Sequence, residues 1–420
     1  MCKIMYNQMR SILFITISIL YLNYKVKESS EISVFAFKLL SIKKKFVPVY
    51  GTSSKSSSTD LFEFKEWCTE QGILTPLNLR IRDDEKNSNE RESNKYRFME
   101  YSDDQSFTNR PETLDGPILR VPLKSCIIGE SPEDLSIKLA KERDLGDESF
   151  FSPYIKVLPT LESSSLQCMP RMWPEEKMDK ISEFDGGQIY KKVSMDENKN
   201  KDLDLDPWAY ACVKSRANYL LDKGFAMTPI LDMINHDSAS QTSARIVEDE
   251  LYLSLSKKFP KDKEVFISYG DLTNLETLCN YGFVSETNEC NVEFVDVSVI
   301  RRQPVQVMID DRSGGSLDAG SLATLRSYLT PPEVLEKLLE TDSNLSINTV
   351  FTKPISETIE EDMYSLIASF VDEAIYQSNN GISWAKENQD GLLEKYFNAR
   401  VSVLNKGLEY IKRKFPDLLY

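Results

Sequence analysis

Residues 263–284 read KEVFISYGDLTNLETLCNYGFV and predict a strand, a sharp turn and a short helix. The apolar positions Val265, Ile267 and Tyr269 recur at every second residue, which is typical of a strand, and Gly270 ends the run. Tyr269 therefore leaves the expected strand at its carboxyl end. A lone tyrosine at such a position is usually a core residue, so the alternation by itself assigns it no function.

The rest of the stretch predicts a helix with both ends marked. Thr273 and Glu276 have capping-box spacing, and Gly282 is typical of a helix stop because glycine adopts left-handed backbone angles at little cost. Tyr281 thus ends the helix as Tyr269 ends the strand. Two tyrosines, each followed by a glycine at the end of an element, are candidates for one shared site.

Length and charge restrict the kind of protein. A chain of 420 residues is long for a single core, so we expect two domains. The formal net charge of −15 argues against nucleic-acid binding, which normally requires a basic face. The acidic balance suits a partner that brings lysine or arginine, and it suits a merely soluble surface equally well.

Cysteine and histidine usage excludes several kinds of site. The seven cysteines include no C-x-x-C pair, which disfavours disulfides and a cysteine zinc site and favours a reducing compartment, cytoplasmic or nuclear. His236 is the only histidine, which excludes H-E-x-x-H zinc chemistry, and no G-x-S-x-G elbow is present. We therefore expect no metal site.

Composition divides the chain into three regions. Residues 1–59 form an extension with a serine-rich linker and an apolar run at 11–22. This run is short for a membrane span, so a membrane partner is not expected unless the run is an anchor, and organelle targeting is the alternative. Residues 60–295 mix short strands and helices, with a helical insert at about 150–228. Residues 296–420 predict a helical domain.

Short elements are expected before the opening stretch. The pattern predicts helix 61–72, strands 77–81 and 118–128, solvated loop 83–94, helix 135–143, irregular aromatic segment 149–159, a helix start near Trp173, polar loop 185–206, helix 206–224 and hairpin 245–255.

Arg216 lies on the inward stripe of the helix that Asp206 begins, eight residues after Trp208. A buried charge without a counter-charge is strongly destabilising, so Arg216 should have an anionic partner. An internal carboxylate such as Asp232 and the carboxylate of a ligand fit the spacing equally well.

Residues 229–237 read PILDMINHD and set three polar side chains, Asp232, Asn235 and His236, inside an apolar run. Polar groups flanked by buried neighbours need hydrogen-bond partners. A structural turn would meet that need, and so would a ligand site.

Taken together, PILDMINHD, FISYG and NYGFV resemble the core motifs of SET-domain protein methyltransferases, closest to the group of the RuBisCO large-subunit lysine methyltransferase. Supporting resemblances follow in order at 64–72, 118–122, 148–159, 208–217 and 322–335, and the whole covers about residues 60–415. The resemblance implies an α+β fold, in which a SET-type β-fold of short strands with an α-helical insert precedes an all-α C-terminal lobe. It also implies methyl transfer from S-adenosyl-L-methionine to a protein lysine.

The resemblance further implies roles for single residues. Tyr269 would be catalytic and would contact the cofactor, and Arg216 would hold the carboxylate of the cofactor's methionine moiety. The other expected cofactor-binding residues are Asp232, Met233, Ile234, Asn235, His236, Tyr281, Gly282 and Phe283. The expected substrate-binding residues are Tyr281, Arg216 and Asp232.

One region departs from the family pattern. The first hairpin of the family usually has a glycine-rich turn that lets the backbone approach the cofactor, whereas residues 95–101 (KYRFMEY) contain no glycine. Two alternatives therefore stand beside a lysine methyltransferase: a catalytically silent SET-fold module that binds a partner protein, and a methyltransferase acting on protein histidine. In each case we expect a monomer whose partner is a protein, and for the enzyme a protein that presents a lysine.

Overall fold

A computed structural model describes residues 58–75, 77–83, 95–101, 117–200, 202–240, 242–255, 264–286, 288–341, 346–347 and 349–416. The predicted apolar run at 11–22 lies outside these ranges, as does nearly all of the predicted loop 83–94. Among the described helices none is both long enough and apolar enough to cross a membrane.

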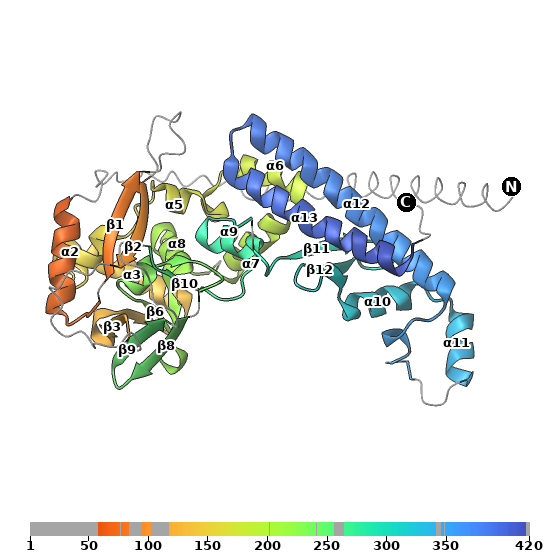
Figure 1. Cartoon of the computed structure of the whole chain (residues 1–420), viewed down its shortest axis with the longest axis horizontal. Coiled ribbons are helices and arrows are strands. Elements are labelled where there is room, and N and C mark those ends of the chain that lie inside the picture. The colour runs from red at the N-terminus through yellow and green to blue at the C-terminus, as the bar shows by residue number, and fades with distance from the viewer. Residues whose placement is uncertain are drawn as a thin grey trace. The chain divides into compact units, whose positions relative to one another are not determined.

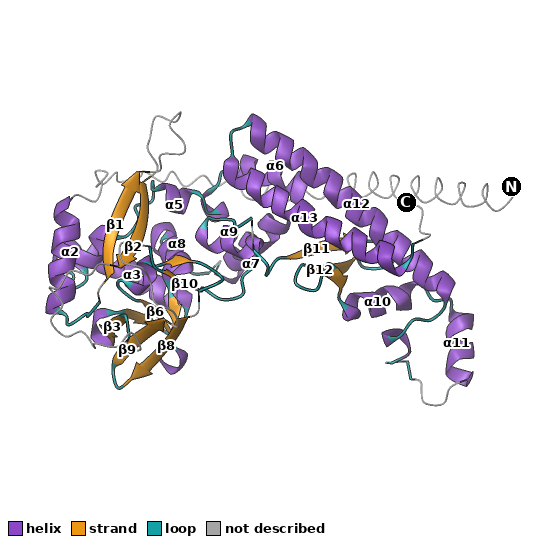
Figure 2. Cartoon of the chain, viewed as in Figure 1, coloured by secondary structure: helices purple, strands orange, loops and turns teal. Residues whose placement is uncertain are grey.

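Short strands make up four small sheets in the first part of the described chain (Figures 1 and 2). Three of the sheets are antiparallel, and the fourth is a parallel pair. They are the hairpin of β1 (Leu77–Asp83) and β2 (Lys95–Tyr101), the sheet of β3 (Leu119–Pro122), β9 (Glu250–Leu255) and β8 (Thr242–Val247), the sheet of β4 (Ile127–Gly129), β6 (Phe225–Met227) and β5 (Asn218–Tyr219), and the pair of β7 (Asn235–His236) and β10 (Phe266–Ile267).

Helices surround these sheets, and the helices up to residue 167 together with the one at 207–216 share one hydrophobic core with them, whereas the helices at 175–185, 188–199 and 274–281 belong to a separate cluster. The α-helices are α2 (Ser58–Glu70), α3 (Pro132–Asp144), α4 (Ser152–Val157), α5 (Ser164–Gln167), α6 (Glu175–Asp185), α7 (Gln188–Lys199), α8 (Pro207–Arg216) and α9 (Asn274–Tyr281). Single 3-10 turns lie at 123–125, 146–148, 170–172, 221–223 and 231–233. Phe64, Trp67 and the fully buried Tyr154 stack in this core and hold α2 against α4.

Three of the expected elements are wrong. The segment 149–159 is not irregular throughout, because Pro153 occupies the first turn of α4, where proline is tolerated. The polar loop 185–206 contains α7, whose inward side buries Ile189 and Val193. The helix from Asp206 ends at Arg216 rather than near Gly224, so Tyr219 lies on β5 and is exposed.

A second core forms the carboxyl-terminal part. A three-stranded sheet, which the sequence pattern did not predict, packs against a long helical hairpin of α12 and α13 (Figure 1). The elements are β11 (Val292–Val297), β12 (Val305–Asp310), β13 (Ser316–Leu317), α10 (Ala319–Leu329), α11 (Pro332–Thr341), a 3-10 turn at 350–352, α12 (Glu357–Glu387) and α13 (Gly391–Lys414).

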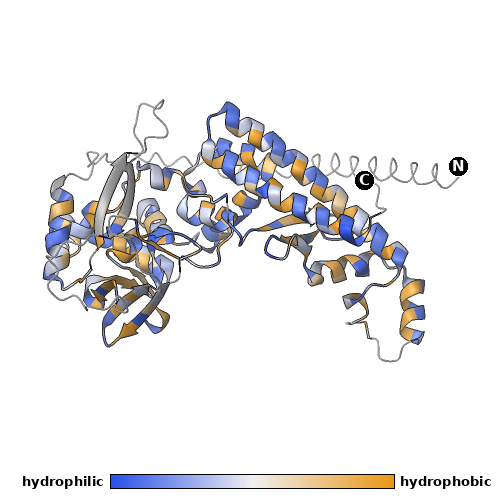
Figure 3. Cartoon of the chain, viewed as in Figure 1, coloured by the Kyte–Doolittle hydropathy of each residue, from blue (hydrophilic) through white to orange (hydrophobic). Residues whose placement is uncertain are grey.

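Hydropathy follows burial in most helices, and α11 is the exception. Figure 3 shows apolar and polar residues alternating along α12 and α13, as expected for helices that bury one face. In α11 no residue is buried, although Val334, Leu335 and Leu338 share one face. This helix therefore gains little stability from packing against the described residues.

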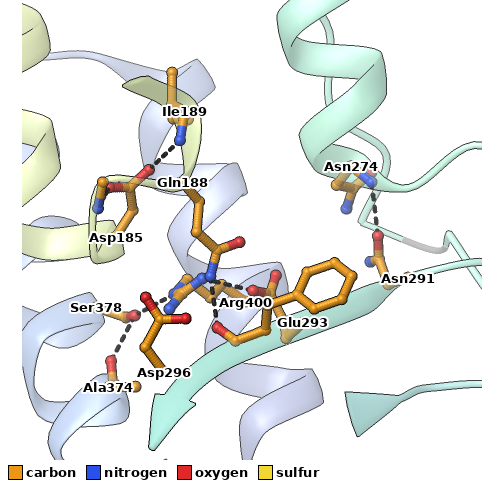
Figure 4. A network of polar contacts seen from close by, with 12 residues as sticks. Asp185, Gln188, Ile189, Asn274, Asn291, Glu293, Asp296, Ala374, Ser378 and Arg400 are labelled. Atoms are coloured by element: carbon orange, nitrogen blue, oxygen red, sulfur yellow. Dashed lines mark hydrogen bonds and ion pairs between the residues drawn. The ribbon is translucent and has the colours of Figure 1, made fainter. Parts of the chain in front are cut away.

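A buried polar network joins α6, α7, β11, α12 and α13 (Figure 4). Nη1 of Arg400 donates to Glu293 over 2.6 Å, and Nε donates to Ser378 over 3.1 Å. The Gln188 amide donates to the Phe294 carbonyl over 2.7 Å, and the Asp185 carboxylate caps the start of α7 by accepting from the Ile189 amide. Burial raises the pKa of both the Glu293 and the Asp185 carboxyls, although the charge of Arg400 opposes the shift.

Candidate active site

The stretch that opens with the expected strand folds largely as its local signals predict. Strand β10 is limited to Phe266–Ile267, and the preceding Val265 amide donates to the Met99 carbonyl over 2.8 Å, which ties the stretch to β2. The capping box of Thr273 and Glu276 is present at the start of α9. Gly282 ends this helix with a φ of 75°.

Four aromatic side chains gather where β7, β10 and α9 end. The ring centroids of Tyr269 and Tyr281 lie 4.9 Å apart, and those of His236 and Tyr269 lie 5.0 Å apart. Phe283 closes the group at 5.9 Å from His236 and 6.0 Å from Tyr281. Each of these four residues was a site candidate from the sequence, and each is only partly buried, so the group can line a pocket open to a ligand.

Tyr269 is bonded twice to the segment that the PILDMINHD pattern singled out. Its hydroxyl donates to the Ile234 carbonyl over 2.7 Å, and its backbone amide donates to Nδ1 of His236 over 3.0 Å. Because Nδ1 accepts this bond, the imidazole is held neutral. Burial lowers the pKa of His236, and the charge of Asp237 and a bond with Ile267 raise it by less. His236 therefore orients the tyrosine and is not a charged group at neutral pH.

The side chain of Asn235 is fixed by a residue that sequence reasoning missed. Its amide Nδ2 donates to Oε1 of Glu264 over 2.8 Å, across the parallel pair of β7 and β10. Glu264 directly precedes the predicted strand, and no local signal marked it. This bond fixes the orientation of the Asn235 amide.

Arg216 meets Asp232, but through the backbone. Nη1 of Arg216 donates to the carbonyl oxygen of Asp232 over 2.9 Å, while the buried Nε has no hydrogen-bond partner among the described residues. The sequence left open whether Arg216 pairs with an internal carboxylate or with a ligand carboxylate. In the described part of the chain it bonds to no carboxylate, and its partner is a backbone carbonyl. The Asp232 carbonyl therefore positions the guanidinium, and the N–H group at Nε remains without a hydrogen-bond partner among the described residues.

The carboxylate of Asp232 lies in the core. Its Oδ2 accepts a 2.6 Å bond from the hydroxyl of the fully buried Tyr154, and its Oδ1 has no partner among the described residues. Burial raises the pKa of Asp232 to about 6, although the charge of Arg216 and the bond from Tyr154 both lower it. In the sequence, Tyr154 was part of the aromatic segment 149–159 and of the resemblance at 148–159, and neither predicted its bond to Asp232.

The remaining candidates, Met233, Ile234 and Gly282, are held in place by burial or by close packing. The side chains of Met233 and Ile234 are buried in the core, so these residues can reach a ligand only through their backbone. A side chain at Gly282 would come within 3.0 Å of Cys168 and 3.1 Å of the Ser165 carbonyl, so the glycine is required by close packing against α5 as well as by its φ. Among the described residues no cluster of His, Cys, Asp or Glu is arranged to hold a metal ion.

The unpaired donor of Arg216 provides a test of whether this site suits an amino-acid-bearing nucleoside cofactor. A buried N–H without a partner is unfavourable, and a guanidinium binds a carboxylate through two parallel donors. Arg216 therefore fits a ligand carboxylate. The aromatic group of Tyr269, Tyr281 and Phe283 fits a cationic or apolar ligand atom beside it.

Sequence comparison finds relatives among SET-domain proteins, although no protein-family model matches the chain. Over 181 residues the chain is 29% identical to SET domain-containing protein 4 of Artemia parthenogenetica, a match that covers 37% of this chain and 45% of the relative. Over 285 residues it is 22% identical to the actin-histidine N-methyltransferase of Xenopus tropicalis, a match that covers 61% of this chain and 46% of the relative. The chain thus spans about half the length of these relatives.

Structural comparison gives wider coverage. The crystal structure of the SET domain of LSMT bound to lysine and AdoHcy matches with a TM-score of 0.62 and 19% identity over 86% of this chain and 92% of that chain. The chain therefore has the fold of the LSMT SET-domain structures. This confirms the predicted α+β fold with its helical carboxyl-terminal lobe, and the predicted resemblance to SET-domain proteins of the LSMT group.

Proposed function

We propose that this chain, which has the SET-domain fold, transfers a methyl group from S-adenosyl-L-methionine to a lysine side chain of a protein. The observation that supports the proposal most directly is the pairing of Tyr269 and Tyr281, whose rings lie 4.9 Å apart and come from different elements. Two adjoining aromatic rings of this kind form a surface beside which the apolar stem and amino group of a lysine can pack. The LSMT structure with bound lysine and AdoHcy has the same fold.

The proposed roles follow from the contacts. Arg216 holds the carboxylate of the cofactor, and the backbone of residues 232–236 lies along it, oriented by the Asn235–Glu264 bond. When bound, the cofactor supplies an electrophilic methyl group on a sulfonium. Gly282 acts by holding Tyr281 and Phe283 in place at the end of α9. Asp232 positions Arg216 through its backbone carbonyl, which accepts a hydrogen bond from the guanidinium.

The reaction needs a neutral amine and no strong base. Free lysine has a pKa of about 10.4, so roughly one side chain in 2,500 is neutral at pH 7. Burial beside the aromatic rings and a nearby positive charge both lower that pKa. The hydroxyl of Tyr269 donates a hydrogen bond to the Ile234 carbonyl, so its oxygen keeps lone pairs that can accept weak bonds from the methyl or the amine.

A histidine acceptor is the second candidate function. It is favoured by the similarity to the actin-histidine N-methyltransferase, which extends over 61% of this chain. An imidazole is flat and shorter than a lysine side chain, so the shape of the site beside Tyr269 and Tyr281 would select between them. The glycine-free hairpin of β1 and β2 favours the third candidate, a silent module that binds a protein without methylating it.

Calorimetric titration of the full chain with S-adenosyl-L-methionine and with S-adenosylhomocysteine tests the proposal. We expect saturable binding of both. A folded protein that binds neither would leave only the silent module. Where binding is found, labelled methyl groups transferred to a proteome extract should be recovered as methyl-lysine after hydrolysis, and recovery as methyl-histidine would select the second candidate.

A further inference from the structure

Arg216 and Asp232 each keep unused hydrogen-bonding capacity. Arg216 has a buried Nε without a partner, and Asp232 has a buried Oδ1 without a partner, both among the described residues. The Arg216 side chain is bonded to the backbone carbonyl of Asp232, which accepts from Nη1 over 2.9 Å, and its charge lowers the pKa of the Asp232 carboxyl against the larger effect of burial. Two residues that one hydrogen bond joins, each with a buried polar atom left unpaired among the described residues, form an arrangement that a ligand and a proton can complete.

We propose that Asp232 is the internal counter-charge of Arg216 in the cofactor-free protein, and that Asp232 takes up a proton when a ligand carboxylate binds Arg216. Tyr154 and Asp232 are then positioning residues that act through Arg216. The inference rests on the proposed function, because it assumes that the ligand is a nucleoside cofactor with an amino-acid group.

The charge balance around Asp232 supports this coupling. The titratable groups that face Asp232 are Tyr154 on α4, Cys68 on α2, Cys126 before β4, and Cys212 and Arg216 on α8. Burial raises the pKa of Tyr154 and of all three thiols, so these groups stay neutral at physiological pH. Arg216 is therefore the one cation among them, and Asp232 is the one anion.

A ligand carboxylate at Arg216 would add a second anion beside Asp232, and the α-ammonium of the same ligand, which lies further from the guanidinium, offsets this charge only in part. An unbalanced charge of this kind is strongly unfavourable in a low-dielectric core. Protonation of Asp232 removes the imbalance and leaves Arg216 to the ligand. Asp232 is prepared for this change, because burial already raises its pKa to about 6 and its bond from Tyr154 can reverse direction once the carboxyl carries a proton.

Calorimetry in two buffers with different ionisation enthalpies measures the proton directly. For S-adenosylhomocysteine at pH 7.5 we expect uptake of about one proton, because Asp232 is mostly ionised there before binding. For 5′-methylthioadenosine, which lacks the amino-acid group, we expect none. At pH 5 the uptake with S-adenosylhomocysteine should also vanish, because the carboxyl is already protonated.

Variants of single residues show which residue takes up the proton when the ligand binds. Asp232→Asn should abolish the uptake and bind S-adenosylhomocysteine about tenfold more tightly at pH 8, because no internal anion competes for Arg216. Asp222→Asn, which removes an exposed carboxylate on the 3-10 turn at 221–223, is the matched control and should leave the uptake unchanged. Tyr154→Phe should keep the uptake and move its midpoint to higher pH.

The pH dependence of stability, measured without ligand, shows whether Asp232→Asn is folded and has lost the titrating carboxyl. The folded-state pKa of Asp232 lies above its ordinary value of 3.8, so its contribution to stability is fully present below pH 3.8 and is lost as the pH rises through about 6. Denaturant unfolding of Asp232→Asn should lack this loss. Ligand binding without proton uptake by the natural chain would overturn the inference alone, whereas absence of ligand binding would overturn the proposed function together with it.

Discussion

The hydroxyl of Tyr269 donates a 2.7 Å hydrogen bond to the carbonyl oxygen of Ile234, while the backbone amide of Tyr269 donates to the ring of His236 two residues further along that segment. One tyrosine therefore connects the end of β10 to both ends of a three-residue span. The arrangement holds the Tyr269 ring against Tyr281, and the hydroxyl proton is used in the hydrogen bond to Ile234. A residue held in this way suits a role in orienting a reactant more than a role as a base.

Replacing Tyr269 by phenylalanine should abolish most methyl transfer and leave cofactor binding nearly intact. The substitution removes only the oxygen, so a rate loss of about 10²–10³ is expected if that oxygen stabilises the transition state. Labelled-methyl transfer gives the rate, and calorimetry gives the affinity. Tyr252→Phe, which removes a hydroxyl bonded to Glu250 on the hairpin of β8 and β9, is the control. Unchanged turnover in Tyr269→Phe would remove Tyr269 from the catalytic role.

Replacing Arg216 by alanine should weaken S-adenosylhomocysteine binding by about 10- to 100-fold, the value of one or two bonds between a charged donor and a carboxylate. Arg245→Ala, at an exposed position of β8, should leave the affinity unchanged. Calorimetry on both variants makes the comparison. Equal affinity for Arg216→Ala and the natural chain would mean that Arg216 serves only to bind the Asp232 carbonyl.

Local signals were sufficient where the physical cause was local. The capping box of Thr273, the glycine stop at Gly282 and the start of α8 at Asp206 each involve residues within four positions of one another, and all three are present. The alternation from Val265 to Tyr269 predicted a strand, and only the two residues that pair with β7 adopt one.

Distant partners could not be predicted from spacing. Tyr154 reaches Asp232 across 78 residues and Glu264 reaches Asn235 across 29, and each bond depends on how separate elements pack. Helix α7 was taken for a loop because only a few apolar residues mark its inward side, and their burial comes from contact with α9 and with the helical hairpin. Sequence patterns therefore marked Asp232 and Asn235 as site candidates, which they remain, whereas the bonds that hold these side chains were not predicted.

Replacing Gly282 by alanine should destabilise the fold more than removing the helix cap at Thr273. The glycine has a φ of 75° and lacks room for a side chain beside Cys168, so both strain and overlap oppose alanine, at a cost of about 2–4 kcal/mol. Thr273→Ala loses one capping bond and should cost about 1 kcal/mol. Urea unfolding compares the two. A smaller loss at Gly282 would show that α5 can move away from the end of α9.

The single histidine allows a direct titration. Burial lowers the pKa of His236, so its NMR resonance should titrate below the ordinary midpoint of 6.5. Because the folded-state pKa is depressed, the neutral ring contributes stability above pH 6.5 that is lost as the pH falls through the folded-state value. An untagged chain is required, so that no other imidazole contributes. A midpoint above 6.5 would mean that the Tyr269 amide does not hold the ring neutral.

Breaking the buried network at Arg400 should be among the most destabilising single changes in the carboxyl-terminal part. Arg400→Met leaves the Glu293 carboxylate buried without its cation, and we expect a loss of about 3–5 kcal/mol in the free energy of unfolding. Lys386→Met, in an exposed ion pair with Glu394, should cost less than about 1 kcal/mol. The double variant Arg400→Met with Glu293→Met should recover most of the loss, since no charge is then left unpaired at that contact. A double variant no more stable than Arg400→Met would mean that Ser378 and the helix packing around Arg400, rather than the charge pair, carry the stabilisation.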